Sequence, residues 1–241
     1  MANRPLVQEL MLLGLGADGR VVGRNPGFDY ALAGAVLLEL ALAQRLDVVD
    51  KRVAALPGAP LREPVLADAL SAIERDKRRR AKDWIPRLSR SLRKRVLADL
   101  VRGGLTGMQV THVLKVFPST RYPVTDAAGL PELRAAVEAA VRGGGTVAEP
   151  PVAQPPVAQP PVAEPRVAEP RVAALCSLIG PAGLGRRLFP DLPRRELRRR
   201  LDEISRGTWA SEAVRAAVRE VQAATAAVAA VAAAGGAVAS S

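Results

Sequence analysis

Apolar residues recur every three or four positions through most of this chain, which is the spacing of a helix that buries one face. Leu6, Leu10 and Leu13 begin the pattern, and the three glycines within residues 14–19 end that helix in a turn. The spacing continues in four later stripes: Leu66, Leu70 and Ile73; residues 130–141; Leu197, Leu201 and Ile204; and Trp209, Ala213, Ala217 and Val221. The chain is therefore predicted to be mainly α.

Residues 30–43 differ from these stripes because they are apolar nearly all round. Asp29 directly precedes them and is a suitable N-cap. A helix without a polar face is normally buried on every side. We expect it to be a central buried helix surrounded by the amphipathic ones.

Two parts of the chain carry strand signals. Residues 46–49 and 53–56 are apolar runs on either side of a short polar turn, which predicts a hairpin. Residues 110–117 are rich in β-branched residues and partly alternating, so they predict a single strand, with residues 118–123 following as a loop. Between these parts, Pro64 is well placed for the first position of a helix.

A long basic stretch occupies residues 75–95. Its apolar positions, and those directly after it, lie four residues apart: Trp84, Leu88, Leu92 and Val96. This spacing predicts one long helix with an apolar inner face and arginines on its other faces. Gly103 and Gly104 end that helix.

Residues 143–171 interrupt the helical pattern. Four successive copies of a five-residue unit containing Val-Ala fill residues 151–170; all four end in proline, and the first three also begin with it. Such sequence has no core to bury and favours extended polyproline II, so we interpret it as a spacer, with a recognised Pro-rich ligand as the alternative. One helical domain is then built from residues 1–142 and 172–222.

Residues 223–241 are rich in Ala and Gly and carry no charge. Their number is close to the ~20 residues that span a bilayer, which makes membrane contact one interpretation. Ala contributes little to transfer into lipid, however, so we predict a disordered tail.

The chain is strongly basic, with a formal net charge of +11 and a pI near 11.0. Such a charge attracts nucleic acid or anionic lipid. Cys176 and His112 are each the only residue of their type, which excludes an intrachain disulfide, a Cys-based metal site and a His-pair metal site. No signal peptide opens the sequence, so we expect a protein of the reducing cytoplasm.

Signatures of catalysis are missing from the sequence, which has no P-loop, no complete dinucleotide fingerprint and no nucleophile elbow. The acidic residues Glu9, Asp29, Glu39 and Asp68 are scattered, and no pattern brings two of them together. We therefore predict a protein that is not an enzyme and that uses no metal or cofactor.

The basic stretch supplies the best candidate site. Arg90 and Arg93 are three residues apart, so on the predicted helix they share one face and can share one anionic group. Arginine presents a planar fork that matches phosphate oxygens. Four further cations widen this field: Arg87, Lys94, Arg95 and Arg121. A solvated basic face is the alternative, and it is also our interpretation of the second basic run at residues 194–200.

Nine segments follow the order and spacing of a known family: residues 6–13, 18–20, 32–42, 57–60, 65–70, 84–85, 92–105, 117–124 and 171–191. They resemble the Golgi phosphoprotein 3 family, specifically its bacterial members. The similarity covers roughly residues 5–222, apart from the repeat.

The resemblance implies a mainly α domain with a central buried helix and a protruding β-hairpin at about residues 105–121. It also implies phosphatidylinositol 4-phosphate binding at a membrane surface and a hairpin that contacts membrane or a partner subunit, which makes a homo-oligomer an expectation. Two headgroup arginines of the family match Arg90 and Arg93. The family's central-helix arginine falls at Ala33, and its tryptophan falls near Arg24, which we expect to supply charge there instead.

We therefore expect a cytoplasmic protein, peripherally associated with membrane, that binds anionic, phosphoinositide-like headgroups. A winged-helix nucleic-acid-binding protein is the alternative, because a basic helix followed by a β-hairpin fits that pattern as well. Two features disfavour nucleic acid as the partner. No short helix-turn-helix pair precedes the hairpin in the predicted elements, and residues 84–101 are long for a recognition helix.

Overall fold

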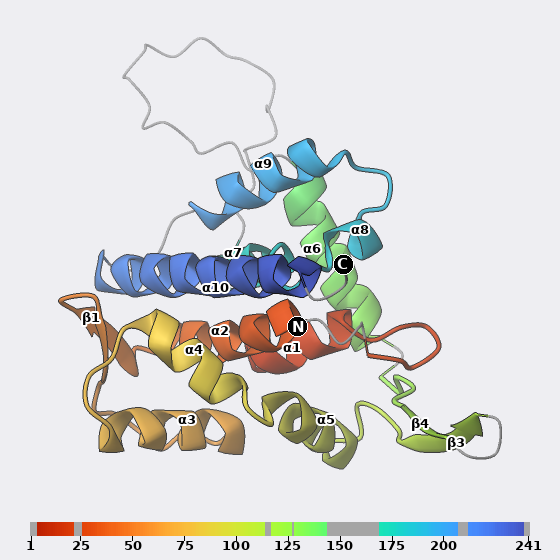
Figure 1. The fold of residues 1–241 in the computed structure, drawn as a ribbon, viewed down its shortest axis with the longest axis horizontal. Helices are drawn as coiled ribbons and strands as arrows, with labels where there is room; N and C mark the ends of the chain where they lie inside the picture. Colours follow the sequence, from red (N-terminus) through yellow and green to blue (C-terminus); the bar gives the residue numbers. More distant parts are fainter. Residues whose placement is uncertain are drawn as a thin grey trace, which may run out of the picture.

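The computed structural model describes residues 4–21, 26–113, 117–126, 128–143, 169–206 and 212–238. Within these ranges the protein is mainly helical, with two small antiparallel strand pairs, which confirms the predicted fold class (Figure 1). The helices are α1 (Leu6–Leu13), α2 (Pro26–Leu42), α3 (Pro64–Arg75), α4 (Ala81–Ser89), α5 (Leu92–Arg102), α6 (Gly129–Arg142), α7 (Pro170–Ile179), α8 (Gly185–Leu188), α9 (Arg194–Ser205) and α10 (Glu212–Val238). The strands are β1 (Leu46–Val49), β2 (Arg52–Ala55), β3 (Gln109–Val113) and β4 (Phe117–Arg121).

Helix α2 is the centre of the fold, as its apolar character on all sides predicts. It packs against α1, α3, α4, α5, α7 and α10, and most of its residues are buried. The helix begins at Pro26, one turn earlier than expected, so Asp29 lies in its first turn and not at the N-cap. An acidic side chain in the first turn still interacts favourably with the helix dipole.

Helix α10 lies along α2 and replaces the disordered tail that we expected from residue 223 onward (Figure 1). Alanine has the highest helix propensity, and the face of α10 that bears Val221, Ala224 and Thr225 is buried. Gly34 of α2 permits the close approach of the two helices, since a Cβ atom there would lie 2.5 Å from Oγ1 of Thr225. Tertiary packing therefore extends the helix well beyond the predicted end of the domain.

Strands β1 and β2 form the short hairpin predicted from the sequence. Its turn residues, Asp50 and Lys51, have φ values of 52° and 59°. Positive φ at both central residues is what a two-residue type I′ turn requires. A further bridge pairs Val53 of β2 with Arg79, so the connection between α3 and α4 lies along this hairpin.

Strands β3 and β4 form a second hairpin, which projects from the body beyond the C-terminal end of α5 (Figure 1). The prediction of one strand at residues 110–117 and a loop at 118–123 is wrong, because residues 117–121 are the second strand. Pro118 hides the strand in the sequence, since proline lowers any strand signal although edge strands tolerate it. The hairpin implied by the family resemblance is present.

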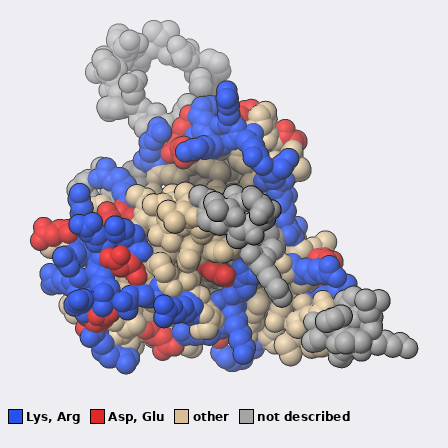
Figure 2. Space-filling model, viewed as in Figure 1, with Lys and Arg blue, Asp and Glu red and all other residues tan. Residues whose placement is uncertain are grey.

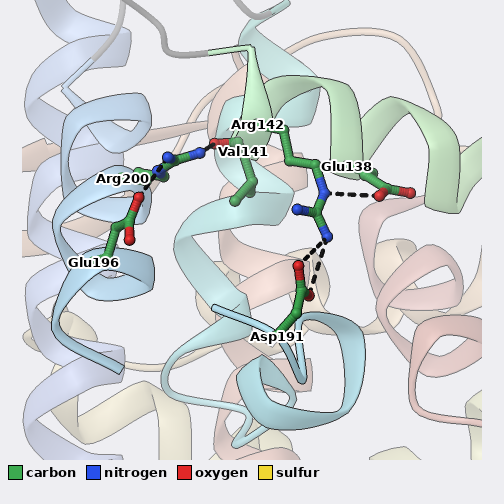
Figure 3. Close-up of polar contacts among 6 residues, drawn as sticks. All are labelled: Glu138, Val141, Arg142, Asp191, Glu196 and Arg200. Carbon is green, nitrogen blue, oxygen red and sulfur yellow. Dashed lines mark hydrogen bonds and ion pairs between the residues drawn. The ribbon is translucent and has the colours of Figure 1, made fainter. Parts of the chain in front are cut away.

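Arginine contacts hold the end of α6, from which the predicted spacer departs. Arg142, the last residue of α6, contacts Glu138 at 2.8 Å and Asp191 at 2.9 Å, while Arg200 of α9 donates to the carbonyl of Val141 at 3.1 Å (Figure 3). Residues 144–168 of the spacer lie outside the described residues. Helix α7 already begins at Pro170, two residues before the predicted restart of the domain.

Candidate functional site

The basic helix predicted as one element is two helices, α4 and α5, separated at Arg90 and Ser91. Arg90 ends α4 with a ψ of 122°, and Ser91 is left-handed with a φ of 59°. The hydroxyl of Ser89 donates to the carbonyl of Pro86 at 3.0 Å, a local bond of the kind by which serine competes with helix continuation. Arg90 and Arg93 are therefore not neighbours on one helix face, and that prediction is wrong. They lie on opposite sides of the break.

The break leaves the N-terminal end of α5 next to Arg90. Ser91 is the N-cap, but its side chain makes no capping hydrogen bond, and the first turn contains no acidic residue. The first N–H groups of a helix have no acceptor within the helix and carry partial positive charge. Lys94 adds a full positive charge to this end, which favours an anion.

Arg90 and Lys94 are the most available cations at this junction. Both side chains are exposed, and within the described ranges neither forms an ion pair. Neither side chain therefore has to give up a carboxylate in order to bind a ligand.

Arg93 is anchored to the start of α2. Its Nε atom lies 2.7 Å from a carboxylate oxygen of Asp29, and its guanidinium lies 5.2 Å from the ring centre of Phe28. Only 23% of the Arg93 side chain is exposed. A ligand anion would share this guanidinium with Asp29. No local pattern in the sequence links Arg93 with Asp29, which is 64 positions away, or with the adjacent Phe28, so neither contact could be predicted.

Arg87 and Arg95 flank the junction, and both are already paired with carboxylates. Arg87 lies 3.7 Å from Asp76, and Arg95 forms an ion pair with Asp68 of α3. Both arginines are exposed, so these pairs contribute little to stability, but each carboxylate offsets part of the local positive charge.

The remaining positions singled out in the sequence do not join the junction. Arg121 lies in β4, beyond the opposite end of α5, and an 11-residue helix is about 16 Å long. Arg24 lies outside the described residues. Ala33, where the family resemblance places a headgroup arginine, is fully buried in α2.

A second polar cluster joins α1, α2 and the start of α7. Arg171 contacts Glu39 at 2.8 Å and Glu9 at 3.6 Å, and Glu39 accepts the backbone N–H of Leu6 at 2.6 Å. The prediction that no two acidic residues converge is therefore wrong for Glu9 and Glu39. Burial raises the pKa of Glu9. Because the cluster is enclosed by three packed helices, its role is structural.

The second basic run, on α9, has a different charge balance from the junction. Arg198 lies 4.0 Å from Asp202, and Arg199 lies 2.7 Å from Glu203, each pair one helical turn apart. The two arginine side chains are 86% and 62% exposed. They therefore provide a control surface of solvated arginines with local acidic partners.

Metal sites and membrane spans are two other kinds of feature that bear on function. No cluster of three or more His, Cys, Asp or Glu residues in the described part of the chain is arranged to hold a metal ion. None of the helices in the described ranges has both the length and the hydropathy of a membrane span.

Comparisons with known proteins agree with the resemblance found in the sequence. A family described as Golgi phosphoprotein 3 matches this chain over residues 6–221. The chain is also similar to the vacuolar protein sorting-associated protein 74 of Eremothecium gossypii, with 26% identity over 146 residues, which is 50% of this chain and 44% of that protein. The match thus spans less than half the length of this relative.

Proposed function

The chain belongs to the Golgi phosphoprotein 3 family, and on this premise we propose that it is a non-enzymatic protein that binds peripherally to anionic phospholipid headgroups. The proposed site is the α4–α5 junction, defined here as Arg90, Ser91, Arg93 and Lys94. Phosphatidylinositol 4-phosphate, the lipid implied by the family resemblance, is the first candidate ligand.

One observation carries the proposal, namely that the N-terminus of α5 lacks a capping side chain and has Arg90, Arg93 and Lys94 at or beside it. Helix N-termini are normally complemented by a capping side chain or by acidic residues in the first turn. This helix has neither, and it places Arg93 and Lys94 there instead. A phosphate group would accept hydrogen bonds from the helix end and neutralise the adjacent side chains at the same time.

Nucleic acid is the second candidate, and the structure favours it more than the sequence does. Two short helices, α4 and α5, precede the β3–β4 hairpin, and α5 has 11 residues. The sequence lacked a predicted helix pair before the hairpin and predicted a helix too long for recognition. Neither objection to a winged-helix protein applies to the observed helices. Family membership is what favours lipid, and the test must include DNA.

The test is co-sedimentation with vesicles of phosphatidylcholine alone, of phosphatidylcholine with phosphatidylserine, and of phosphatidylcholine with phosphatidylinositol 4-phosphate. We expect pelleting with both anionic vesicles, which added salt weakens, and no pelleting with neutral vesicles. Arg90→Ala combined with Lys94→Ala is the site variant. Arg198→Ala combined with Arg199→Ala is the control, because it removes the same charge from α9.

The two variants distinguish a specific headgroup-binding site from a diffuse positive electrostatic field. A charge-assisted hydrogen bond contributes about 1.5–3 kcal/mol, whereas a cation near an anionic surface contributes about 1 kcal/mol. We expect the site variant to lose at least about tenfold more affinity than the control, a difference of about 1.4 kcal/mol. Equal losses of affinity in the two variants would show that the junction is only a basic face without a defined binding site. Binding to a DNA duplex without binding to any anionic vesicle would replace the lipid proposal with the second candidate.

The β3–β4 hairpin supports a proposal about assembly, namely that it contacts a second copy of the chain. Met108, directly before β3, is 60% exposed, and Val110 within it is 53% exposed. Exposed apolar side chains on a projecting element are typical of contact surfaces. Light scattering after gel filtration should show a homo-oligomer that Met108→Ser with Val110→Thr dissociates. A monomeric parent protein contradicts this proposal.

A further inference from the structure

The connection between α3 and α4, with the residues that flank it, carries a high density of positive charge. Residues 75–82 contain six Lys or Arg residues and one Asp, a net charge of +5 against +11 for the whole chain. None of these residues belongs to the proposed α4–α5 junction.

The backbone of this connection is held in place by the β1–β2 hairpin. The N–H of Val53 donates to the carbonyl of Arg79 at 2.7 Å, and a guanidinium nitrogen of Arg52 donates to the carbonyl of Arg78 at 2.9 Å. The side chains of Lys77, Arg78 and Arg80 are exposed on this fixed segment. The positive charges are therefore presented at defined positions.

Local carboxylates neutralise little of this charge. Asp76 is occupied by Arg79 at 2.8 Å and by Arg87 at 3.7 Å, and its hydrogen bond with Arg79 lowers the pKa of Asp76, which keeps it ionised. Within the described part of the chain, Lys77, Arg78 and Arg80 form no ion pair. This distinguishes them from Arg198 and Arg199 on α9, each of which has an acidic neighbour.

Helix α4 connects this segment with the junction. Trp84 and Ile85 are buried on its inner face, which packs against α2 and α10. The residues at positions 82, 83, 87 and 90 are exposed, and at 100° per residue they lie on the opposite face, where Asp83 is the acidic member. We call the exposed cations of this segment and of this face the basic ridge: Lys77, Arg78, Arg80, Lys82, Arg87 and Arg90. Figure 2 shows many Lys and Arg side chains, with Asp and Glu among them, on the left of the molecule, where Figure 1 places the start of α4.

We propose that the N-terminal part of the basic ridge, residues 77–82, is a second contact with the anionic bilayer and sets the orientation of the protein on it. This inference rests on the proposed lipid-binding function. The junction would hold one headgroup at a helix end, while residues 77–82 would lie against the charged surface beside it without a dedicated pocket. A bilayer is the partner that the chemistry favours. Proteins that bind single-stranded nucleic acid use exposed aromatic platforms, whereas the one aromatic residue of α4, Trp84, is only 3% exposed.

The first test compares two triple variants in the vesicle assay with phosphatidylcholine and phosphatidylserine. Lys77→Ala, Arg78→Ala and Arg80→Ala together remove three ridge charges and leave the backbone contacts to β2 available. Arg195→Ala, Arg198→Ala and Arg199→Ala remove the same charge from α9. A cation close to an anionic surface strengthens binding by about fivefold. The ridge variant should therefore lose at least about tenfold more affinity than the α9 variant, with unchanged circular dichroism.

The outcomes separate this inference from the proposed function. If the parent protein binds anionic vesicles and the two triple variants lose equal affinity, the ridge is not a contact, while lipid binding at the junction stands. If the parent protein does not bind anionic vesicles, the proposed function fails and this inference fails with it. If the ridge variant loses affinity for a DNA duplex and keeps its affinity for vesicles, the ridge is a nucleic-acid surface and the inference is overturned.

A second test measures orientation directly. The chain has one cysteine, Cys176, which is fully buried, so an introduced surface cysteine can be labelled selectively. Asp83→Cys places an environment-sensitive dye on the ridge, and Asp202→Cys places it on α9. Added anionic vesicles should shift the emission of the ridge dye to shorter wavelength and leave the α9 dye unchanged. Equal shifts, or a shift at α9 alone, contradict the proposed orientation.

Discussion

Arg171→Ala is the substitution with the most informative expected effect on folding. Arg171 is the second residue of α7, at the point where the chain returns from the spacer, and it contacts Glu39 of α2 and Glu9 of α1. It is thus the cation that ties the second part of the domain to two helices of the first part. Removing it leaves both carboxylates without this partner.

The expected magnitude follows from burial. The side chains of Glu9 and Glu39 are 7% and 15% exposed, and that of Arg171 is 26% exposed. Removing one partner of a buried ion pair costs about 3–5 kcal/mol. Because Glu9 can take up a proton and so relieve part of the cost, we expect the lower end, about 3 kcal/mol. For a domain of this size 1 kcal/mol lowers Tm by about 2–4 °C, so Tm should fall by about 6–12 °C.

The decrease in Tm caused by Arg171→Ala should depend on pH in a defined direction. The folded-state pKa of Glu9 lies above the ordinary value of 4.5, so the folded protein holds this proton to higher pH than the unfolded chain. This group therefore contributes stability at low pH, and the contribution is lost as pH rises through the folded pKa. Loss of the Arg171 charge raises that pKa further. The difference in Tm between parent and variant should then be largest at neutral pH and shrink as the pH falls toward 4.5.

Thermal unfolding followed by circular dichroism between pH 4.5 and 7.5 measures this effect. Arg142→Ala is the control, because Arg142 also lies at an end of the spacer but its side chain is 41% exposed and its partners Glu138 and Asp191 are 57% and 55% exposed (Figure 3). Exposed pairs contribute little. A drop in Tm for Arg171→Ala no larger than that for Arg142→Ala, or one that is the same at every pH, would contradict the expected role of the buried cluster.

Three further predictions concern other parts of the fold. Deleting residues 151–165, three copies of the repeat, should leave Tm nearly unchanged, because shortening a loop changes the free energy of closing it by only about 0.6 kcal/mol per factor of two. A large decrease in Tm, measured by thermal unfolding, would show that the segment packs on the domain. Gly34→Ala should destabilise by about 1–3 kcal/mol in urea titration, since its Cβ would overlap Oγ1 of Thr225, and Thr225→Ala in the same chain should restore part of the loss. Ser91→Gly should raise the free energy of unfolding by up to about 1 kcal/mol, because glycine adopts the left-handed backbone conformation of this position without strain, and Ser91→Val should lower it. Equal free energies of unfolding for the parent protein and both variants would contradict the role of this turn.

The elements that are encoded locally could be predicted from the amino-acid sequence. The stripes at Leu66, Leu70 and Ile73, and at Leu197, Leu201 and Ile204, are buried faces of α3 and α9, because the helical period places every third or fourth residue on one side. The apolar character of residues 30–43 identified the central helix for a similar reason. The turn at Asp50 and Lys51 between two apolar runs identified the first hairpin.

Features that depend on residues distant in the sequence became apparent in the three-dimensional structure. The period from Trp84 to Val96 continues unbroken through Arg90 and Ser91, so it hides the break that separates α4 from α5. The pairing of Arg93 with Asp29 has no counterpart in the local pattern.

Contacts in the interior and at the C-terminus also could not be predicted from the local sequence. Glu9, Glu39 and Arg171 meet only because α1, α2 and α7 pack together. Composition alone indicated a disordered tail from residue 223, whereas close packing of Thr225 against Gly34 stabilises a helix there. Periodicity reports which face of an element is buried, but the partner that buries it is set by long-range packing, and here that packing also sets which arginines stay available for an anion.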